Sequence, residues 1–572
     1  MHPPSTHPTT PRPSSRRLRF LSPGIERALP KLLPTLALVL LALAWFWSLG
    51  GRTLVSPDEG RYATISWQMV TSGDWITPRL NGLLYFEKPP MQYWIGAIFF
   101  QLFGFNAFAA RLWPALASFL TVLMVGYTGA RLWGRETGLR CLGVAAAMTW
   151  IFANGHFLTL DAGLTLFLTI SLCAVLIARF ADPAPAQPRR WIWLAWAAMA
   201  GAVLSKGLVG ILIPGAVLVI ASLWRRDARI WRGMHWASGL AILLVLAAPW
   251  FVLVSMRNPG FAEFFFIHEH FTRFLTTEHH RAGAWWYYLP LLLLGTLPWT
   301  GALPLLRPKG AEAGARGQLS ATDLLGVWAL FVLFFFSVSG SKLPTYILPM
   351  FPALALLIGQ RLRSLQLRTL RWQLLLPVAL WSLALLASAW VERAGSALAS
   401  PEALASLATG MRCGAAVFLV AAVFAWNCLA RRRLTAAVLG IALGQTVAMA
   451  ILFQSLDGIG QQKSSEAMVA AVEPLIRADT PVFAVRSYDQ GLPFYLGRAV
   501  TLVDYHDEFA FGQSAEPERS IDSLAEFAQR WQSLPQAAAY MDRDTFRVLQ
   551  QHRLPMQVVF EDRSRLLVVK HP

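Results

Sequence analysis

Long apolar runs separated by short polar loops dominate the first 460 residues of the chain. A helix needs about 17 to 25 apolar residues to cross a bilayer, and about thirteen of the runs approach or reach that length. They lie at 31–49, 109–130, 138–156, 162–180, 191–205, 207–224, 236–255, 285–305, 322–338, 343–360, 374–391, 411–430 and 434–453. The pattern predicts a polytopic α-helical membrane domain over 31–460, with about 13 transmembrane helices.

One further apolar run, 91–105, decides the orientation of the chain. If it crosses the membrane, the Arg and Lys clusters between the later runs face outward. If it lies in the membrane interface, every one of these clusters falls on one side, as the distribution of basic residues in cytoplasmic loops requires. We therefore expect a juxtamembrane helix at 91–105. The N-terminus is then cytoplasmic, and the first loop, 50–108, lies on the periplasmic side of a bacterial inner membrane.

The two ends of the chain differ from the apolar middle. Residues 1–30 are rich in Pro, Ser, Thr and Arg, which predicts a disordered cytoplasmic tail. From about 461 the composition becomes that of a soluble domain, and the pattern predicts a periplasmic α/β domain over 461–572. Its expected strands are 481–486, 499–503, 537–541, 556–560 and 566–569, and its expected helices are 466–476 and 520–531.

Composition narrows the class of protein. Of the 572 residues, 55% are hydrophobic and 14% are charged, and the charged share is well below the roughly 25% of soluble proteins. The net charge of +18 comes mainly from short loops that set topology, so nucleic-acid binding is not expected. All four cysteines fall inside apolar runs, which argues against a disulfide framework. The chain contains no Gly-rich nucleotide fingerprint or P-loop, so an ATP-driven pump is unsupported.

The polar stretch Ser56–Pro90 follows the first apolar run and carries the most informative residues of the chain. Asp58 and Glu59 come directly after Pro57, where carboxylates can either serve chemistry or satisfy the exposed amides of a helix start. The outer membrane edge also carries several cations that suit a phosphate held at headgroup depth. These cations are Arg61, Lys88, Lys206, Arg273 and Lys342; the alternative for each is snorkelling to lipid headgroups.

Three other short motifs carry candidate chemistry. Asp161 lies between two apolar runs in LTLDAGLTLF, where an unpaired carboxylate is costly; it is either functional or the N-cap of a helix that begins at Ala162. In FIHEHFTRF, His268 could join Glu87 in binding a divalent metal, and the alternative is an interfacial cluster of His and Arg. Tyr346 in SGSKLPTYILP is either an aromatic-belt anchor or a ligand contact.

Taken together, PDEGRYA in the first loop, FEKPPMQYW further along it and the Asp of LTLDAGLTLF resemble the GT-C glycosyltransferases. More narrowly, they resemble the 4-amino-4-deoxy-L-arabinose lipid A transferases, which are relatives of the protein mannosyltransferases. The resemblance covers all of the chain except the N-terminal tail. It implies transfer of aminoarabinose from undecaprenyl phosphate to a phosphate of lipid A, by an inverting course and without a nucleotide cofactor.

The resemblance also implies roles for single residues. Asp58 and Asp161 would be the key carboxylates. Lys88 and Arg273 would hold the donor phosphate, and Arg61 would support the site. Glu87 and His268 would form a candidate metal pair, and the cavity would be lined by Tyr62, Tyr85 and Tyr346. A lipid A phosphate is already largely ionised near neutral pH. We therefore expect Asp58 to orient the substrate by contacting the sugar ammonium, with general-base catalysis as the alternative for a hydroxyl acceptor.

Two other functions stay open from the sequence. The same fold could transfer another polyprenyl-phosphate sugar to a protein or glycan. A transporter or lipid flippase is the alternative from another class, but transporters place ionisable residues near the membrane midplane, whereas here they collect at the outer edge. The expected partners of the transferase are a polyprenyl-phosphate-linked sugar donor, lipid A or another lipid or glycan acceptor, and membrane lipids, and we expect a monomer.

Overall fold

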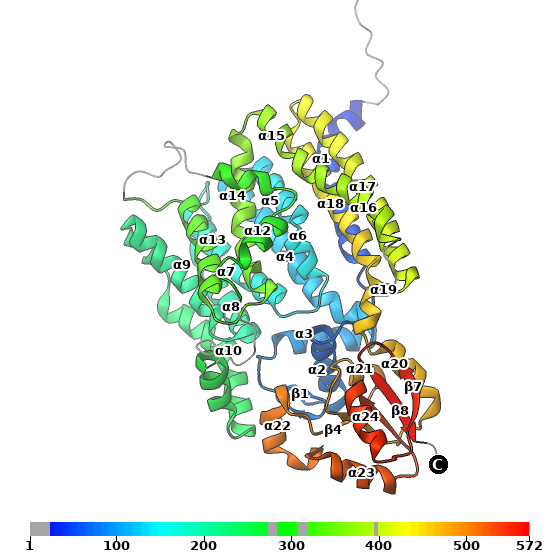
Figure 1. Cartoon of the computed structure of the whole chain (residues 1–572). Coiled ribbons are helices and arrows are strands. Elements are labelled where there is room, and N and C mark those ends of the chain that lie inside the picture. The colour runs from blue at the N-terminus through cyan, green and yellow to red at the C-terminus, as the bar shows by residue number, and fades with distance from the viewer. Residues whose placement is uncertain (1–22, 273–282, 307–316, 394–398, 571–572) are drawn as a thin grey trace, which may run out of the picture.

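The computed structural model describes residues 23–272, 283–306, 317–393 and 399–570. A bundle of helices forms one part, and a sheet domain built from the C-terminal residues forms the other (Figure 1). The helices α2 and α3 of the first loop lie between the two parts (Figure 1). The first loop therefore contacts both parts: α3 packs against α4 of the bundle, and α2 and β2 contact helices of the C-terminal domain.

The bundle consists mainly of helices from the apolar runs. They are α1 (Pro23–Trp47), α4 (Ala107–Trp133), α5 (Arg135–Ala147), α6 (Thr149–Gly155), α7 (Asp161–Phe180), α8 (Pro188–Lys206), α9 (Val209–Arg225), α10 (Trp236–Arg257), η2 (Glu263–Thr272), α12 (Tyr288–Gly295), η3 (Thr300–Leu306), α13 (Ala321–Val338), η4 (Pro344–Met350), α14 (Phe351–Arg361), α15 (Leu367–Gln373), α16 (Leu375–Val391), α17 (Pro401–Ala430) and α18 (Leu434–Gln454).

Eight of the described helical segments are long and apolar enough to cross a membrane, and a ninth is added if the bent pair α12 and η3 forms one span. These are fewer than the thirteen runs expected from the sequence, although each expected run contains at least one helix in the structure. Of the four runs outside this count, 138–156 is broken at Met148 between α5 and α6, α9 has only 17 residues, and 31–49 counts only through the shorter apolar helix Thr35–Trp47. The multi-pass membrane character is confirmed.

The first loop folds into two short helices and a two-stranded hairpin. α2 (Asp58–Ser72) begins after Pro57 and ends at Gly73, which has a φ of +71° that glycine adopts without strain. The hairpin pairs β1 (Arg79–Leu80) with β2 (Leu83–Leu84). α3 (Met91–Phe103) follows Pro90, packs against α2 and α4, and is not among the helices that could span a membrane. The expected juxtamembrane helix is therefore present, two residues shorter than the predicted run.

A fully buried ion pair joins the first loop to the bundle. Glu59 and Arg111 both have 0% exposed side chains, and the Arg111 Nε and Nη2 atoms donate to the two Glu59 oxygens, each at 2.7 Å. Arg111 also donates to the carbonyl oxygens of Leu49, Arg52 and Thr53. Because Glu59 additionally accepts from the backbone of Val55 and Leu158, this pair fixes the entry to α2.

The C-terminal domain contains a six-stranded sheet in the order β5-β4-β3-β6-β8-β7. Its strands are β3 (Val482–Val485), β4 (Thr501–Val503), β5 (Ser520–Ile521), β6 (Ala537–Met541), β7 (Gln557–Glu561) and β8 (Leu566–Lys570), and its α-helices are α19 (Asp457–Gly460), α20 (Glu466–Val472), α21 (Leu492–Leu496), α22 (Ala510–Ala515), α23 (Leu524–Ser533) and α24 (Arg543–Gln551). β3 to β6 run parallel, and β8 pairs antiparallel with β6 and β7. The five expected strands are all present; β5, α21, α22 and α24 were not expected.

The N-terminal boundary differs from the prediction. The first helix already begins at Pro23, so residues 23–30 of the expected disordered tail are helical, and the rest of that tail lies outside the described residues.

Candidate functional site

A chain of charged side chains joins the first loop to the C-terminal domain. On the first turn of α2, Arg61 donates from Nη1 to Asp58 Oδ1 at 2.8 Å. Its Nε donates to Glu508 Oε2 of the C-terminal domain at 2.7 Å. The Asp58 side chain is 37% exposed, whereas that of Glu508 is only 7% exposed. Arg61 is therefore shared between an accessible carboxylate and a buried one.

The electrostatics keep Arg61 charged. Burial alone would lower the pKa of the Arg61 guanidinium, but Tyr85 and Glu508 raise that pKa above its usual value. Burial raises the pKa of Glu508, and Arg61 opposes this effect. A second donor supports the ionised form of Glu508, since Gln490 Nε2 reaches Glu508 Oε1 at 2.7 Å.

A second charged cluster surrounds Asp161. Lys206 at the end of α8 donates to Asp161 Oδ1 at 2.5 Å, and the Thr345 hydroxyl donates to Asp161 Oδ2 at 2.6 Å. The Lys206 ammonium lies 4.2 Å from the centre of the Tyr346 ring, a cation–π contact. Tyr346 is thus part of this cluster, which three separate helices build.

Tyr62 and Tyr85 lie in a buried cluster with Tyr93 between the first loop and the C-terminal domain. Burial is the main cause of the raised pKa of the Tyr62 hydroxyl, and the charges of Asp58 and Asp161 add to it. Burial and then Glu87 raise the pKa of Tyr85. Both phenols therefore stay neutral, and Tyr62 lies within electrostatic reach of both key carboxylates.

Two of the expected phosphate-binding lysines have partners within the chain. Lys88 Nζ donates to the Glu87 carbonyl oxygen at 2.6 Å and lies 4.0 Å from Glu87 Oε2. Lys342 is 8% exposed, and its Nζ donates to the Ser339 carbonyl oxygen at 2.7 Å. Lys88, with a side chain that is 19% exposed, is thus the more accessible of the two.

The expected metal pair stays a prediction. Nothing is described of the His268 side chain, and Arg273 lies outside the described residues. The described residues hold no group of three or more His, Cys, Asp or Glu side chains that could bind a metal ion, and the Glu87 carboxylate faces Lys88.

The capping alternatives have different outcomes for Asp161 and for the two carboxylates of α2. α7 begins at Asp161 itself, and its N-cap residue Leu160 makes no side-chain cap; the Asp161 carboxylate binds Lys206 and Thr345 instead. α2 does begin at Asp58; the Asp58 carboxylate binds Arg61, whereas Glu59 accepts from the Val55 amide, as a carboxylate at a helix start can. Adjacent residues of a helix point about 100° apart, which is why Asp58 faces the outside while Glu59 is buried.

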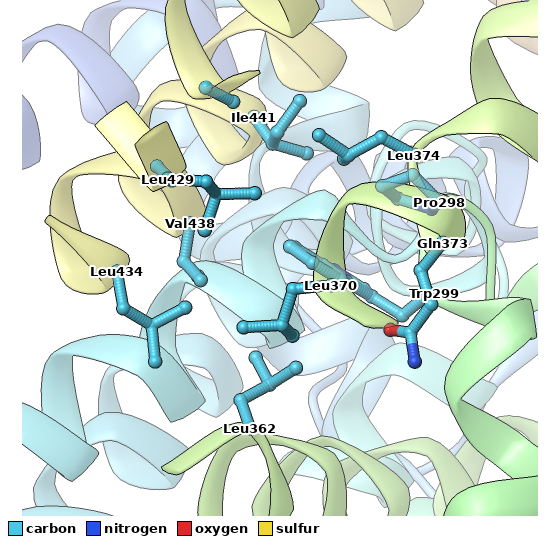
Figure 2. Close-up of a pocket in the computed structure, with 12 residues that line it drawn as sticks. Pro298, Trp299, Leu362, Leu370, Gln373, Leu374, Leu429, Leu434, Val438 and Ile441 are labelled. Atoms are coloured by element: carbon cyan, nitrogen blue, oxygen red, sulfur yellow. The ribbon is translucent and has the colours of Figure 1, made fainter. Parts of the chain in front are cut away.

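An apolar hollow of about 500 Å³ is lined by Val203 and Gly207, which flank Lys206 in the sequence. It is lined mainly by the end of α8, by α10 and by the helix Glu263–Thr272, through side chains such as Leu243, Ala248 and Phe265. A different pocket, lined by Trp299, Gln373 and Val438, lies at the opposite end of the bundle from α2 and α3 (Figures 1 and 2). Its cavity of about 20 Å³ is the size of one water molecule, so it is no substrate site.

Comparison with known proteins matches both parts of the chain. Residues 34–265 match the model of the dolichyl-phosphate-mannose-protein mannosyltransferase family, and residues 468–570 match the aminoarabinose transferase C-terminal domain. The crystal structure of ArnT from Cupriavidus metallidurans bound to undecaprenyl phosphate has 35% identity and a TM-score of 0.87, covering 95% of this chain and 98% of that one. The GT-C fold implied by the sequence motifs is therefore confirmed.

Two curated relatives carry the same name, undecaprenyl phosphate-α-4-amino-4-deoxy-L-arabinose arabinosyl transferase. The protein from Erwinia tasmaniensis is 32% identical over 83% of this chain and 86% of its own length. The protein from Pseudomonas aeruginosa is 38% identical over 63% of this chain, and the match spans 66% of that relative's length. The chain belongs to the family of undecaprenyl phosphate-α-4-amino-4-deoxy-L-arabinose arabinosyl transferases.

Proposed function

We propose that the protein transfers 4-amino-4-deoxy-L-arabinose from undecaprenyl phosphate to a phosphate of lipid A. The name shared by its relatives and the undecaprenyl phosphate bound to the Cupriavidus protein support this substrate pair. The observation that carries the proposal is the Asp161–Lys206 pair at the end of α8, where the next residue, Gly207, lines an apolar hollow. A donor with a charged head and a long apolar tail needs both.

The chemistry needs charge stabilisation more than proton transfer. An oxygen of the lipid A phosphate attacks the anomeric carbon of the sugar, the bond from that carbon to the donor phosphate oxygen breaks, and undecaprenyl phosphate leaves with the electron pair. Positioned cations stabilise the negative charge that develops on the leaving phosphate. Lys88 and Arg273 are the proposed phosphate ligands, and Arg61 and Lys342 are proposed to support them.

Asp58 is proposed to orient the sugar. Its carboxylate is accessible, and a cationic amino group on the sugar is a natural partner for it. Asp161 is proposed to hold Lys206 in place beside Gly207 of the apolar hollow, and Tyr62, Tyr85 and Tyr346 are proposed to line the substrate site. The hollow is proposed to take the first isoprene units of the donor.

We further propose that the protein is a monomer of the bacterial inner membrane with α2, α3 and the C-terminal domain on the periplasmic side. The basic loops at the other end of the bundle support this orientation. Reporter fusions after Phe105 and after Leu456 test it, since both positions should report a periplasmic location.

The substrate proposal is tested by expressing the chain in a strain that lacks its own aminoarabinose transferase. Mass spectrometry of lipid A should then show added aminoarabinose. Unmodified lipid A in the presence of abundant donor lipid would refute the proposal. The proposed metal pair is tested separately, by metal analysis of the purified protein and of its Glu87→Gln variant.

A further inference from the structure

The C-terminal domain presents the carboxyl edge of its sheet to the first loop. β3 and β4 run parallel, so the turns that follow them, 486–491 and 504–508, share one edge. Open α/β sheets place their ligand sites at this edge. Here α2 occupies it: the Thr64 hydroxyl donates to the Gln490 carbonyl oxygen at 2.8 Å, and a Cβ on Gly60 would lie 2.5 Å from the Gly491 nitrogen.

The backbone at this edge is held in an uncommon conformation. Arg486, Asp504 and Asp507 have φ angles of 54°, 48° and 33°, in the left-handed region that non-glycine residues rarely adopt. Such residues persist only where the surrounding contacts determine the conformation, and they concentrate at functional sites. The turns are therefore built to place particular side chains.

Gln490 and Glu508 are the side chains that this edge places against Arg61. Gln490 is 8% exposed, and its Nε2 donates to Glu508 Oε1 at 2.7 Å, while Glu508 Oε2 accepts from Arg61 Nε at 2.7 Å. Both Glu508 oxygens are thus engaged. Gln490 therefore fixes the rotation of the carboxylate that binds Arg61.

Arg61 therefore binds two carboxylates at once, Asp58 and Glu508. Only its Nη1 reaches Asp58, at Oδ1, and among the described residues no donor binds Asp58 Oδ2. If Glu508 could rotate, the guanidinium would be able to turn and bind both Asp58 oxygens, because this bidentate geometry is the one Arg favours. Asp58 would then lose the oxygen that a substrate cation requires.

We propose that Gln490 is a positioning residue for sugar transfer, which acts through Glu508 to keep Arg61 from closing on Asp58. The role of Asp58 in this inference rests on the proposed function. Gln490 itself contacts neither substrate; its effect is the geometry of the Asp58–Arg61–Glu508 chain.

The test compares the purified wild-type protein with Gln490→Leu, Glu508→Gln and the double variant. We expect Gln490→Leu to lower kcat about ten- to a hundredfold, the cost of a misplaced active-site group, with the KM for lipid A changed less than about twofold. In the Glu508→Gln background, Gln490→Leu should have no further effect on kcat. Unchanged kcat in the single variant, or an equal loss in both backgrounds, would overturn the proposal.

Gln536→Leu is the matched control. Gln536 also makes two side-chain hydrogen bonds inside the C-terminal domain, with Thr480 and with the Leu475 carbonyl oxygen, and neither bond involves a residue of α2. Both leucine variants should lower the melting temperature by similar amounts, whereas only Gln490→Leu should lower kcat. Equal losses of kcat would assign the effect to instability of the domain.

An experimental structure of Gln490→Leu gives a readout that does not depend on which sugar is transferred. Arg61 should bind both oxygens of Asp58 in this variant, and an unmoved Arg61 would overturn the inference. Failure of the proposed function would instead appear in the wild-type protein, as absence of aminoarabinose on lipid A.

Discussion

Replacing Arg111 with Met would leave the Glu59 carboxylate fully buried without its cationic partner. Breaking a buried ion pair from one side costs about 3–5 kcal/mol, because the remaining charge stays out of water. Arg111 also satisfies the carbonyl oxygens of Leu49, Arg52 and Thr53, and each carbonyl left without a donor costs about 1–3 kcal/mol in isolation, though not additively. We therefore expect Arg111→Met to lower the free energy of unfolding by at least about 3 kcal/mol.

The assay is denaturant unfolding of the purified protein in detergent micelles, followed by tryptophan fluorescence. The exposed pair Arg257–Asp74, with side chains 55% and 33% exposed, is the control, and Arg257→Met should cost less than about 1 kcal/mol. The double variant Glu59→Gln/Arg111→Met should be more stable than Arg111→Met alone, since no unpaired charge remains. A cost for Arg111→Met no larger than that of the control would refute the reasoning.

The pH dependence of stability follows from the same pair. Burial would raise the pKa of Glu59, but Arg111 outweighs it and holds that pKa below the usual value of 4.5. A carboxyl group whose pKa is lowered by folding stabilises the fold above its unfolded pKa. This contribution should therefore persist at neutral pH and disappear only as the pH falls below about 4.5 towards the folded-state pKa.

Four further outcomes are expected. Asp58→Asn should abolish lipid A modification, measured by mass spectrometry, with the melting temperature kept; full activity would remove Asp58 from the mechanism. Lys206→Met should lower kcat/KM about tenfold or more by leaving Asp161 unpaired, whereas an unchanged value would make that pair purely structural. The acid limb of the pH profile of kcat should lie above pH 4.5, because the pKa of Glu508 is raised and Glu508 releases Arg61 when it becomes protonated. Glu87 and Gln490 also face the Glu508 carboxylate. An acid limb that survives in Glu508→Gln would have another origin. Ala248→Trp should raise the KM for the undecaprenyl donor by filling the hollow beside Lys206, and Val245→Trp, on the exposed face of the same helix, should not; equal effects would place the donor tail elsewhere.

The helical membrane domain could be predicted because hydropathy is a local property. The exact bounds of the helices could not, since the break at Met148 and the length of α9 depend on how the helices pack. The strands of the C-terminal domain were predicted from short β-branched and apolar runs, whereas β5, with two residues, carries too little pattern to detect.

The candidate site divides in the same way. The sequence motifs named five residues that interact in the folded protein through a hydrogen bond or through their charges. They are Asp58, Arg61, Tyr62, Tyr85 and Asp161. Glu508 and Gln490 were missed. They lie in a domain whose composition is that of an ordinary soluble protein, so no local sequence pattern distinguishes them. Arg61 and Glu508 are 447 positions apart in the chain, and only folding brings them into contact.

The sequence alone therefore determined the class of protein, the juxtamembrane helix after Pro90 and the motifs of the first loop that resemble those of the family. Only the tertiary structure decided that the neighbours Asp58 and Glu59 have opposite environments, one accessible beside Arg61 and the other buried against Arg111. It also decided that Asp161 binds Lys206 instead of capping its helix. The reason is physical: periodicity reports which face of a helix is apolar, but the partner of a buried charge is set by segments that meet only when the chain has folded.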